Sequence, residues 1–233
     1  MFLLGVFAPA FVSIAITWSN GGAPGVRYLV QGIARWQLAG GYYAFAIFLL
    51  AAVKLTAALF YFLLTGEWPA FGTTPWPLML AGILVSTWVQ AGEEIGWRAY
   101  ALPRLAHRLG LAGGSIVLGI IWAFWHLPLF FIPGSGSDGQ SFPIYLLYVT
   151  ALSVAMAWLY WRTGGSLLLT MVMHASMNNT RDIIPSTMGG AANPWSLNAS
   201  TMSVLTVLLL WLIAVPLLWR MHRVRLATEH HVE

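Results

Sequence analysis

Residues 88–100, Trp-Val-Gln-Ala-Gly-Glu-Glu-Ile-Gly-Trp-Arg-Ala-Tyr (WVQAGEEIGWRAY), place two adjacent carboxylates inside an apolar segment. The chain holds only seven Asp and Glu residues, and two of them, Glu93 and Glu94, lie side by side here. An ionised side chain at the centre of a membrane helix costs roughly 2.5 to 3.5 kcal/mol on insertion scales, and such residues usually mark function. This stretch therefore predicts both a membrane setting and a functional site within it.

The composition of the chain sets its fold class. Of 233 residues, 59% are hydrophobic and 8% are charged, against about 25% charged in an ordinary soluble domain. So few charges cannot cover a water-facing surface of this size, and the sequence predicts an all-α, polytopic transmembrane helical bundle with a catalytic cavity inside it. We expect a single integral membrane domain over residues 1–233, with the lipid bilayer as its surroundings.

Two further features of the composition exclude classes of function. The net charge is +4, but the basic residues form no stripe with interleaved aromatics, which speaks against a nucleic-acid partner. The chain has no cysteine, and this excludes disulfides, thiolate metal ligands and a cysteine nucleophile.

About seven apolar segments are long enough to span a bilayer, since roughly 17 to 25 residues cross the hydrocarbon core. A signal peptide is the competing interpretation of the first segment, but no basic stretch precedes it and no small-residue cleavage site follows, which favours a retained span. Lys54 interrupts the second segment, and we expect it to face a polar interior. The predicted spans cover residues 2–18, 42–64, 76–102, 111–132, 142–161, 166–184 and 202–219.

A short amphipathic segment follows the first span. Apolar residues recur there at helical spacing, with polar residues on the other side, which favours a basic helix lying in the headgroup region. A loop with chance spacing is the alternative. The apolar face is Val26, Leu29, Val30 and Ile33, and the polar face is Arg27, Gln31 and Arg35.

Basic residues alternate between the connections, and this predicts the topology. Loops that carry arginines alternate with loops nearly free of them, and all basic segments fall on one side. The pattern predicts an external N-terminus and a cytoplasmic C-terminus. We expect the membrane to be a prokaryotic plasma membrane. The basic positions are Arg27 and Arg35, then Arg98, Arg104 and Arg108, then Arg162, then Arg220, Arg223 and Arg225.

The carboxylate pair belongs to a Glu-Glu-x-x-x-Arg motif. Glu94 and Arg98 are four residues apart and can pair on one helix face, while Glu93 is turned about 100° away from its neighbour. One carboxylate is then a structural partner while the other points into a cavity. The alternative is an interfacial cluster, solvated where the helix leaves the membrane. Extending the helix to Leu102 brings Glu93 to the depth of the next motif, so we expect a long or tilted helix.

Two more polar groups interrupt later apolar segments. His126 ends the sequence Trp122-Ala-Phe-Trp-His126, and a lone histidine there is also consistent with a satisfied interfacial residue. His174-Ala-Ser-Met-Asn178 puts an imidazole and an amide one turn apart on the same face. Interhelical packing by hydrogen bonds is the alternative for this second pair.

Together these residues form a set with a common chemistry. An acid, two imidazoles and an amide from three apolar segments are what water-mediated amide hydrolysis needs. Glu93 is the candidate general base for a water and then the acid for the leaving amine. His126 is placed to hold that water, and His174 with Asn178 to donate to the developing oxyanion.

At these residues the chain resembles the CPBP family of intramembrane glutamic endopeptidases, which includes type II CAAX prenyl proteases and bacteriocin-processing and immunity proteins. The family pattern of Glu-Glu-x-x-x-Arg, Phe-x-x-x-His and His-x-x-x-Asn reads here as EEIGWR, WAFWH and HASMN, within about residues 78–182. The resemblance implies a catalytic Glu93 supported by Glu94 and Arg98, with His126, His174 and Asn178 in the roles above. Trp122 stands where the family has Phe, which keeps an aromatic wall but alters the cavity.

The resemblance implies hydrolysis of a peptide bond in a membrane-embedded or lipid-anchored substrate, CAAX-type substrates among them, without a cofactor. Zinc held by Glu93, His126 and His174 is the chemical alternative, although the chain has no His-Glu-x-x-His sequence. Outside enzymes, the sequence is also consistent with a non-catalytic membrane scaffold or immunity protein, or with a transporter that uses Glu93 as a proton relay.

Overall fold

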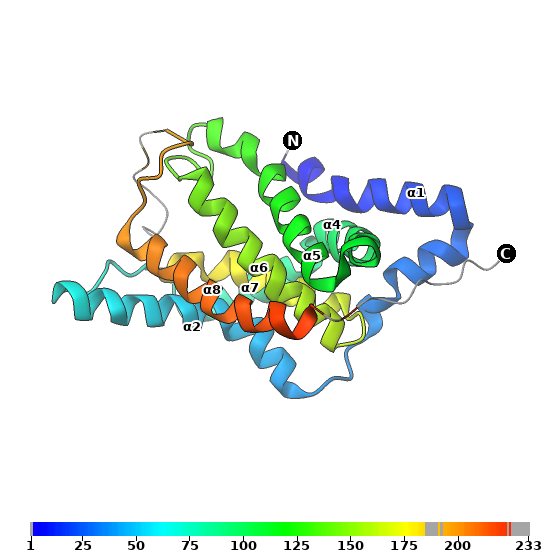
Figure 1. Cartoon of the computed structure of the whole chain (residues 1–233), viewed down its shortest axis with the longest axis horizontal. Helices are drawn as coiled ribbons and strands as arrows, with labels where there is room; N and C mark the ends of the chain where they lie inside the picture. Colours follow the sequence, from blue (N-terminus) through cyan, green and yellow to red (C-terminus); the bar gives the residue numbers. More distant parts are fainter. Residues whose placement is uncertain (1, 185–190, 192, 223, 225–233) are drawn as a thin grey trace.

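The computed structural model describes residues 2–184, 191, 193–222 and 224. This part of the chain is helical and contains no strand (Figure 1). The predicted all-α membrane bundle is confirmed. The elements are α1 (Phe2–Val30), η1 (Gln31–Ala34), α2 (Gly40–Thr65), α3 (Trp76–Val89), α4 (Ala91–Glu94), η2 (Ile95–Ala101), α5 (Leu102–Trp125), η3 (Leu127–Phe131), α6 (Phe142–Arg162), α7 (Leu167–Asn179), η4 (Thr180–Ile183) and α8 (Thr201–Met221).

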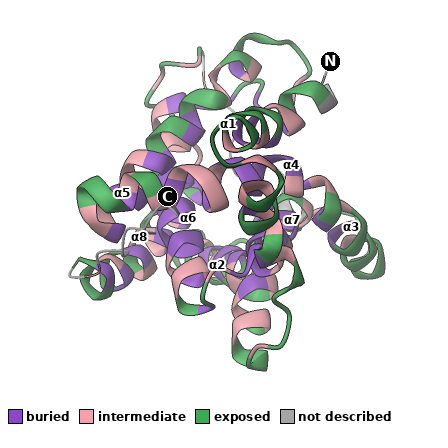
Figure 2. Cartoon of the chain, turned by 90° about the vertical axis from the view of Figure 1, so that its right-hand side faces the viewer, coloured by how far each residue is buried: buried purple, intermediate pink, exposed green. Residues whose placement is uncertain are grey.

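Helix α6 forms the centre of the bundle. It packs against α5 on one side, against α8 on another and also against α7, and its residues from Tyr148 to Ala157 are all buried. Figure 2 shows the buried residues gathered on the helices around α6 and α7, and exposed residues on the outward faces of α1 and α3. Helices α5 and α6 approach each other closely at Gly119 of α5, where a Cβ atom would lie 2.7 Å from Cα of Thr150 on α6.

The outward faces of the bundle are apolar. Large hydrophobic side chains such as Leu84, Trp88, Leu212 and Trp219 are more than 60% exposed, which is expected where lipid and not water is the solvent. Among the described residues, five helical segments are long and apolar enough to cross a membrane, so the chain is an integral membrane protein. They are Leu4–Ala34, Gly40–Thr65, Trp76–Phe131, Phe142–Arg162 and Thr201–Met221.

The predicted count of seven spans is not confirmed. Two predicted spans, residues 76–102 and 111–132, fall within the one segment Trp76–Phe131. Pro103 does not interrupt the helical segment, because it occupies the first turn of α5, where its missing N–H is not needed. The sharp change of direction comes instead at Gly110, whose φ of 71° favours glycine.

Helix α7 is the second departure from the seven predicted spans. The predicted sixth span covers residues 166–184, whereas α7 has 13 residues and is about 20 Å long at 1.5 Å per residue. Its N-terminus is capped by Ser166, whose hydroxyl accepts from the amide of Leu169. At its other end the buried Lys54 donates from Nζ to the carbonyl oxygen of Thr180 at 3.1 Å. Lys54 thus faces a polar interior, as the sequence predicts, with its charge at a helix C-terminus.

The amphipathic segment after the first predicted span is confirmed as helical. It continues α1 beyond a kink at Gly22, whose φ is 55°. Leu29 is buried in a cluster with Leu167 and Met171 of α7, while Arg27 and Arg35 are exposed. The apolar face therefore packs on the bundle, whereas Arg27 is exposed and Arg35 extends towards Gly164 in the loop after α6.

Candidate active site

The two glutamates lie at a change of helix geometry. The α-helix α3 ends at a turn at Gln90, α4 carries Glu93 and Glu94, and the chain then continues as a π-helix over Ile95–Ala101. Segments of π-helix are rare and frequently occur at functional sites. The chain is helical through to Leu102 and beyond, in agreement with the long helix that the sequence predicts.

Two glycines bring α1 against this segment. Gly92 and Gly96 are four residues apart, a spacing of small residues that lets helix backbones approach closely. A Cβ atom on Gly92 would lie 2.7 Å from the carbonyl oxygen of Val6, and one on Gly96 would lie 2.5 Å from Cβ of Pro9. The two glutamates between these glycines are thereby turned away from α1 and towards the bundle.

Glu94 is the centre of an ionic network. Its Oε1 atom accepts from Nη1 of Arg98 at 2.8 Å and contacts Nδ1 of His174, also at 2.8 Å. Glu94 and Arg98 are both fully buried, and His174 is 3% exposed. Removing two charges from solvent is costly, and pairing with hydrogen bonds offsets that cost. Glu94 is therefore held in place on both sides, by its own helix and by α7.

The guanidinium of Arg98 has further partners in the bundle. Its Nη2 atom lies 3.1 Å from Sδ of Met156 on α6, and its Cζ atom lies 4.3 Å from the ring centroid of Trp122. The second interaction is a cation–π contact, which is favourable where water is excluded. Arg98 thus ties the π-helix to α5 and α6.

Glu93 has a different environment from Glu94. Its Oε2 atom accepts from Nε1 of Trp122 at 2.8 Å and from Nε1 of Trp97 at 3.2 Å. The side chain is 5% exposed. The ring of Trp122 lies 5.1 Å from that of His174 and 6.1 Å from that of His126, so both imidazoles lie next to the indole that donates to Glu93.

Each of the two histidines makes its hydrogen bond through its own Nδ1 atom. Nδ1 of His126 lies 2.8 Å from the carbonyl oxygen of Trp122, one turn earlier. Because a carbonyl oxygen only accepts, Nδ1 carries the proton and Nε2 is the free acceptor of the neutral ring. Nδ1 of His174 is directed at the Glu94 carboxylate in the same way, so Nε2 is the atom that each ring offers to a ligand.

Asn178 and Asn179 have different positions on α7. Asn178, one turn after His174, is exposed. Asn179 is half-buried and donates from Nδ2 to Oγ of Ser86 and to the carbonyl oxygen of Ala175, each at 2.8 Å. Asn179 therefore joins α7 to α3, and Asn178 is the amide available to a ligand.

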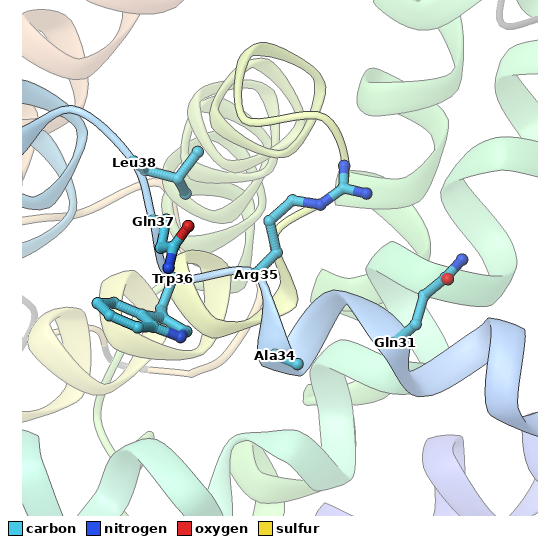
Figure 3. A pocket seen from close by; sticks show the side chains of 6 residues that line it. All are labelled: Gln31, Ala34, Arg35, Trp36, Gln37 and Leu38. Atoms are coloured by element: carbon cyan, nitrogen blue, oxygen red, sulfur yellow. The ribbon is translucent and has the colours of Figure 1, made fainter.

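A cavity of about 590 Å³ lies away from these residues. Figure 3 shows that it is formed along the connection between η1 and α2, with Arg35 reaching across it towards the loop after α6. None of the residues in the three motifs lines it. Its lining is Gln31, Ala34, Arg35, Trp36, Gln37 and Leu38.

The predicted zinc alternative can be compared with the side-chain geometry. In the part of the chain that the structure describes, no three His, Cys, Asp or Glu side chains converge as a group that could hold a metal ion. Nδ1 of His174 is engaged with Glu94, and Glu93 Oε2 accepts two indole N–H groups.

Sequence reasoning missed two residues of the site. Trp97 is four residues after Glu93, and this spacing on one helix face was the available signal. Met156 carries no signal in the sequence, because a methionine in an apolar span is ordinarily a packing residue. Trp122 was expected only as an aromatic wall, whereas its indole also donates to Glu93.

Comparison with known proteins agrees with this constellation. The sequence pattern of the family described as type II CAAX prenyl endopeptidase Rce1-like matches residues 74–180. A protein from Methanococcus maripaludis called CAAX prenyl protease 2 is 28% identical over 121 residues, which are 49% of this chain and 43% of the relative. The chain thus matches less than half the length of that relative. The matched residues 74–180 hold all three motifs, and over them the chain is similar to the type II CAAX prenyl endopeptidases.

Proposed function

We propose that the chain is an intramembrane endopeptidase that hydrolyses a peptide bond of a membrane-associated substrate by a glutamate-activated water. The observation that carries the proposal is the unequal environment of the two adjacent carboxylates. Glu94 is bound by Arg98 and His174, whereas both hydrogen bonds of Glu93 fall on Oε2. Glu94 serves as a structural anchor, and Glu93 is the base.

In the proposed reaction, the water oxygen attacks the carbonyl carbon while Glu93 takes one of the water's protons. Nε2 of His126 accepts a hydrogen bond from the same water and orients it. The developing oxyanion accepts hydrogen bonds from Nε2–H of His174 and from the amide of Asn178. In this scheme the His174 ring acts as an imidazolium that donates from Nδ1–H to Glu94 and from Nε2–H to the oxyanion.

The second step returns the proton. The tetrahedral intermediate collapses, the C–N bond breaks, and Glu93 gives its proton to the leaving nitrogen. The products are an amine and a carboxylic acid, which loses its proton to water, and Glu93 returns to its ionised form. No metal or cofactor is required in this scheme.

The substrate class follows from the family and from the named relative. A C-terminal CAAX peptide with a prenyl chain is lipid-anchored, and the apolar outer surface of the bundle is suited to such a substrate. We also propose that the protein is prokaryotic and that its C-terminus lies in the cytoplasm.

The test is cleavage of a quenched fluorogenic CAAX peptide, with and without a farnesyl group, by the protein purified in detergent. Glu93→Gln is expected to abolish cleavage, while Glu67→Gln, at an exposed glutamate of the α2–α3 connection, leaves it intact.

Activity that survives a chelator supports the glutamate mechanism. Loss on chelation with recovery in zinc would move Glu93, His126 and His174 into the ligand role. Full activity of Glu93→Gln would refute the proposal, and inactivity of the folded wild type towards every peptide would favour a scaffold.

A further inference from the structure

We infer that Trp122 is a positioning residue that, with Trp97, fixes Oε2 of Glu93 and thereby selects Oε1 as the oxygen that receives the proton of the water. The inference rests on the proposed function and deepens it. It assigns to Trp122 a hydrogen-bonding role that an aromatic wall does not have.

The hydrogen bonds at Glu93 are one-sided. An indole N–H can only donate, and the two indoles lie 2.8 Å and 3.2 Å from the same oxygen, Oε2. An oxygen with two donors has both of its lone-pair positions occupied. Among the described residues, Oε1 makes no hydrogen bond, so the reacting proton can only go there.

Glu93 Oε1 is also not enclosed. In the described part of the chain, the fully buried side-chain atoms without a partner are Thr17 Oγ1, Glu94 Oε2 and Arg98 Nε. Oε1 of Glu93 does not belong to this group, although its residue is only 5% exposed. The spare oxygen of Glu94 is thus fully buried, whereas that of Glu93 keeps some accessible surface.

The ring of Trp122 is itself held by the other motifs. It is 3% exposed, the Arg98 guanidinium lies 4.3 Å from its centroid, and the rings of His174 and His126 lie edge-on to it at 5.1 Å and 6.1 Å. A ring contacted from three sides cannot swing away from Glu93. Because the ring is already fixed, its N–H group orients the Glu93 carboxylate at a low cost in conformational entropy.

Trp122 is the position at which this chain departs from the family pattern, which has Phe there. Phenylalanine fills a similar apolar space but has no N–H group. A Phe at this position would leave Trp97 as the one indole donor to Oε2, at the longer distance of 3.2 Å. The indole of Trp122 therefore supplies the shorter of the two hydrogen bonds to Oε2.

An isosteric replacement separates hydrogen bonding from packing. Site-specific incorporation of β-(3-benzothienyl)alanine at position 122 keeps the bicyclic shape and replaces the N–H by sulfur, whereas Trp122→Phe removes both. Loss of one hydrogen bond to a charged group is expected to lower kcat roughly tenfold to a hundredfold in both variants, with KM unchanged. 5-Fluorotryptophan, which retains the N–H, is expected to preserve kcat.

The matched control is the same replacement at Trp158, whose ring packs against Tyr42 and Phe45 and which is expected to keep wild-type kcat. Size-exclusion chromatography establishes that each variant is folded. A benzothienyl variant at position 122 with wild-type kcat would overturn the inference and leave Trp122 as a packing residue, while Glu93→Gln would still be inactive. Full activity of Glu93→Gln would instead refute the proposed function itself.

Discussion

Nδ1 of His174 lies 2.8 Å from Oε1 of Glu94, and the two residues are 80 positions apart in the chain. The same oxygen accepts from Arg98, so one atom joins α4, the π-helix and α7. Glu94 is therefore the point through which the last motif of the site is held against the first.

Removal of the Glu94 carboxylate is expected to destabilise the fold. Glu94→Leu leaves the fully buried guanidinium of Arg98 without its anionic partner, and breaking a buried pair in this way costs about 3 to 5 kcal/mol. For a chain of this size the melting temperature should fall by roughly 6 to 20 °C. Thermal unfolding of the protein in detergent measures the change.

The control for this prediction is the double replacement Glu94→Leu with Arg98→Met. It removes both charges and substitutes apolar groups of similar size, so the melting temperature should lie above that of Glu94→Leu alone. A double variant less stable than the single one would show that Arg98 does not depend on Glu94.

His174→Ala is expected to remove one donor to the oxyanion. Loss of such a donor lowers kcat roughly 10²- to 10³-fold, and KM should change little because the interaction forms only in the transition state. Steady-state cleavage of the CAAX peptide measures both constants. A variant with raised KM and normal kcat would place His174 in substrate binding instead.

Replacement of the two adjacent asparagines of α7 should have different effects on activity and stability. Asn178→Ala, at an exposed side chain, is expected to lower kcat with a change in unfolding free energy within about 0.5 kcal/mol. Asn179→Ala loses hydrogen bonds to Ser86 and Ala175, each contributing about 0.5 to 1.5 kcal/mol, so its melting temperature should fall while kcat remains. The reverse outcome would assign the oxyanion role to Asn179.

Gly96→Ala is expected to force α1 away from the π-helix. The added Cβ atom would lie 2.5 Å from Cβ of Pro9 and 2.7 Å from its carbonyl oxygen, and such overpacking costs about 1 to 3 kcal/mol. Activity should fall as well, because α1 supports the segment that carries Glu93. Thermal unfolding and cleavage assays measure the two effects.

Gly5→Ala is the matched control on α1. A Cβ atom there meets nothing within 4 Å, and alanine is the better helix former by about 0.5 to 1 kcal/mol. Its stability should equal or exceed that of the wild type. A similar loss of stability in both variants would show that the effect is unrelated to the contact with Pro9.

Some of the spans could be predicted from the sequence and others could not. Residues 142–161 and 202–219 are apolar runs without a charged residue, and residues 42–64 contain only Lys54. Each of the three corresponds closely to one helix. Residues 103–110 contain Pro and three charged or titratable side chains, a composition that predicts a connection between two spans. They are helical because Pro103 falls in the first turn of α5, a position that depends on where the π-helix before it ends.

The sequence by itself determined the membrane class, the helical fold and the set of motif residues. Composition, span length and the i, i+4 pair of Glu94 with Arg98 are local properties, and local chemistry suffices to predict them. Only the tertiary structure decided which glutamate is anchored, which oxygen of Glu93 carries the indole donors, and that Trp122 is one of those donors. These contacts join α4, α5 and α7. Their geometry is set by the packing of these helices and by the contacts of α1 with the two glycines. Residue spacing within a single segment does not encode such packing.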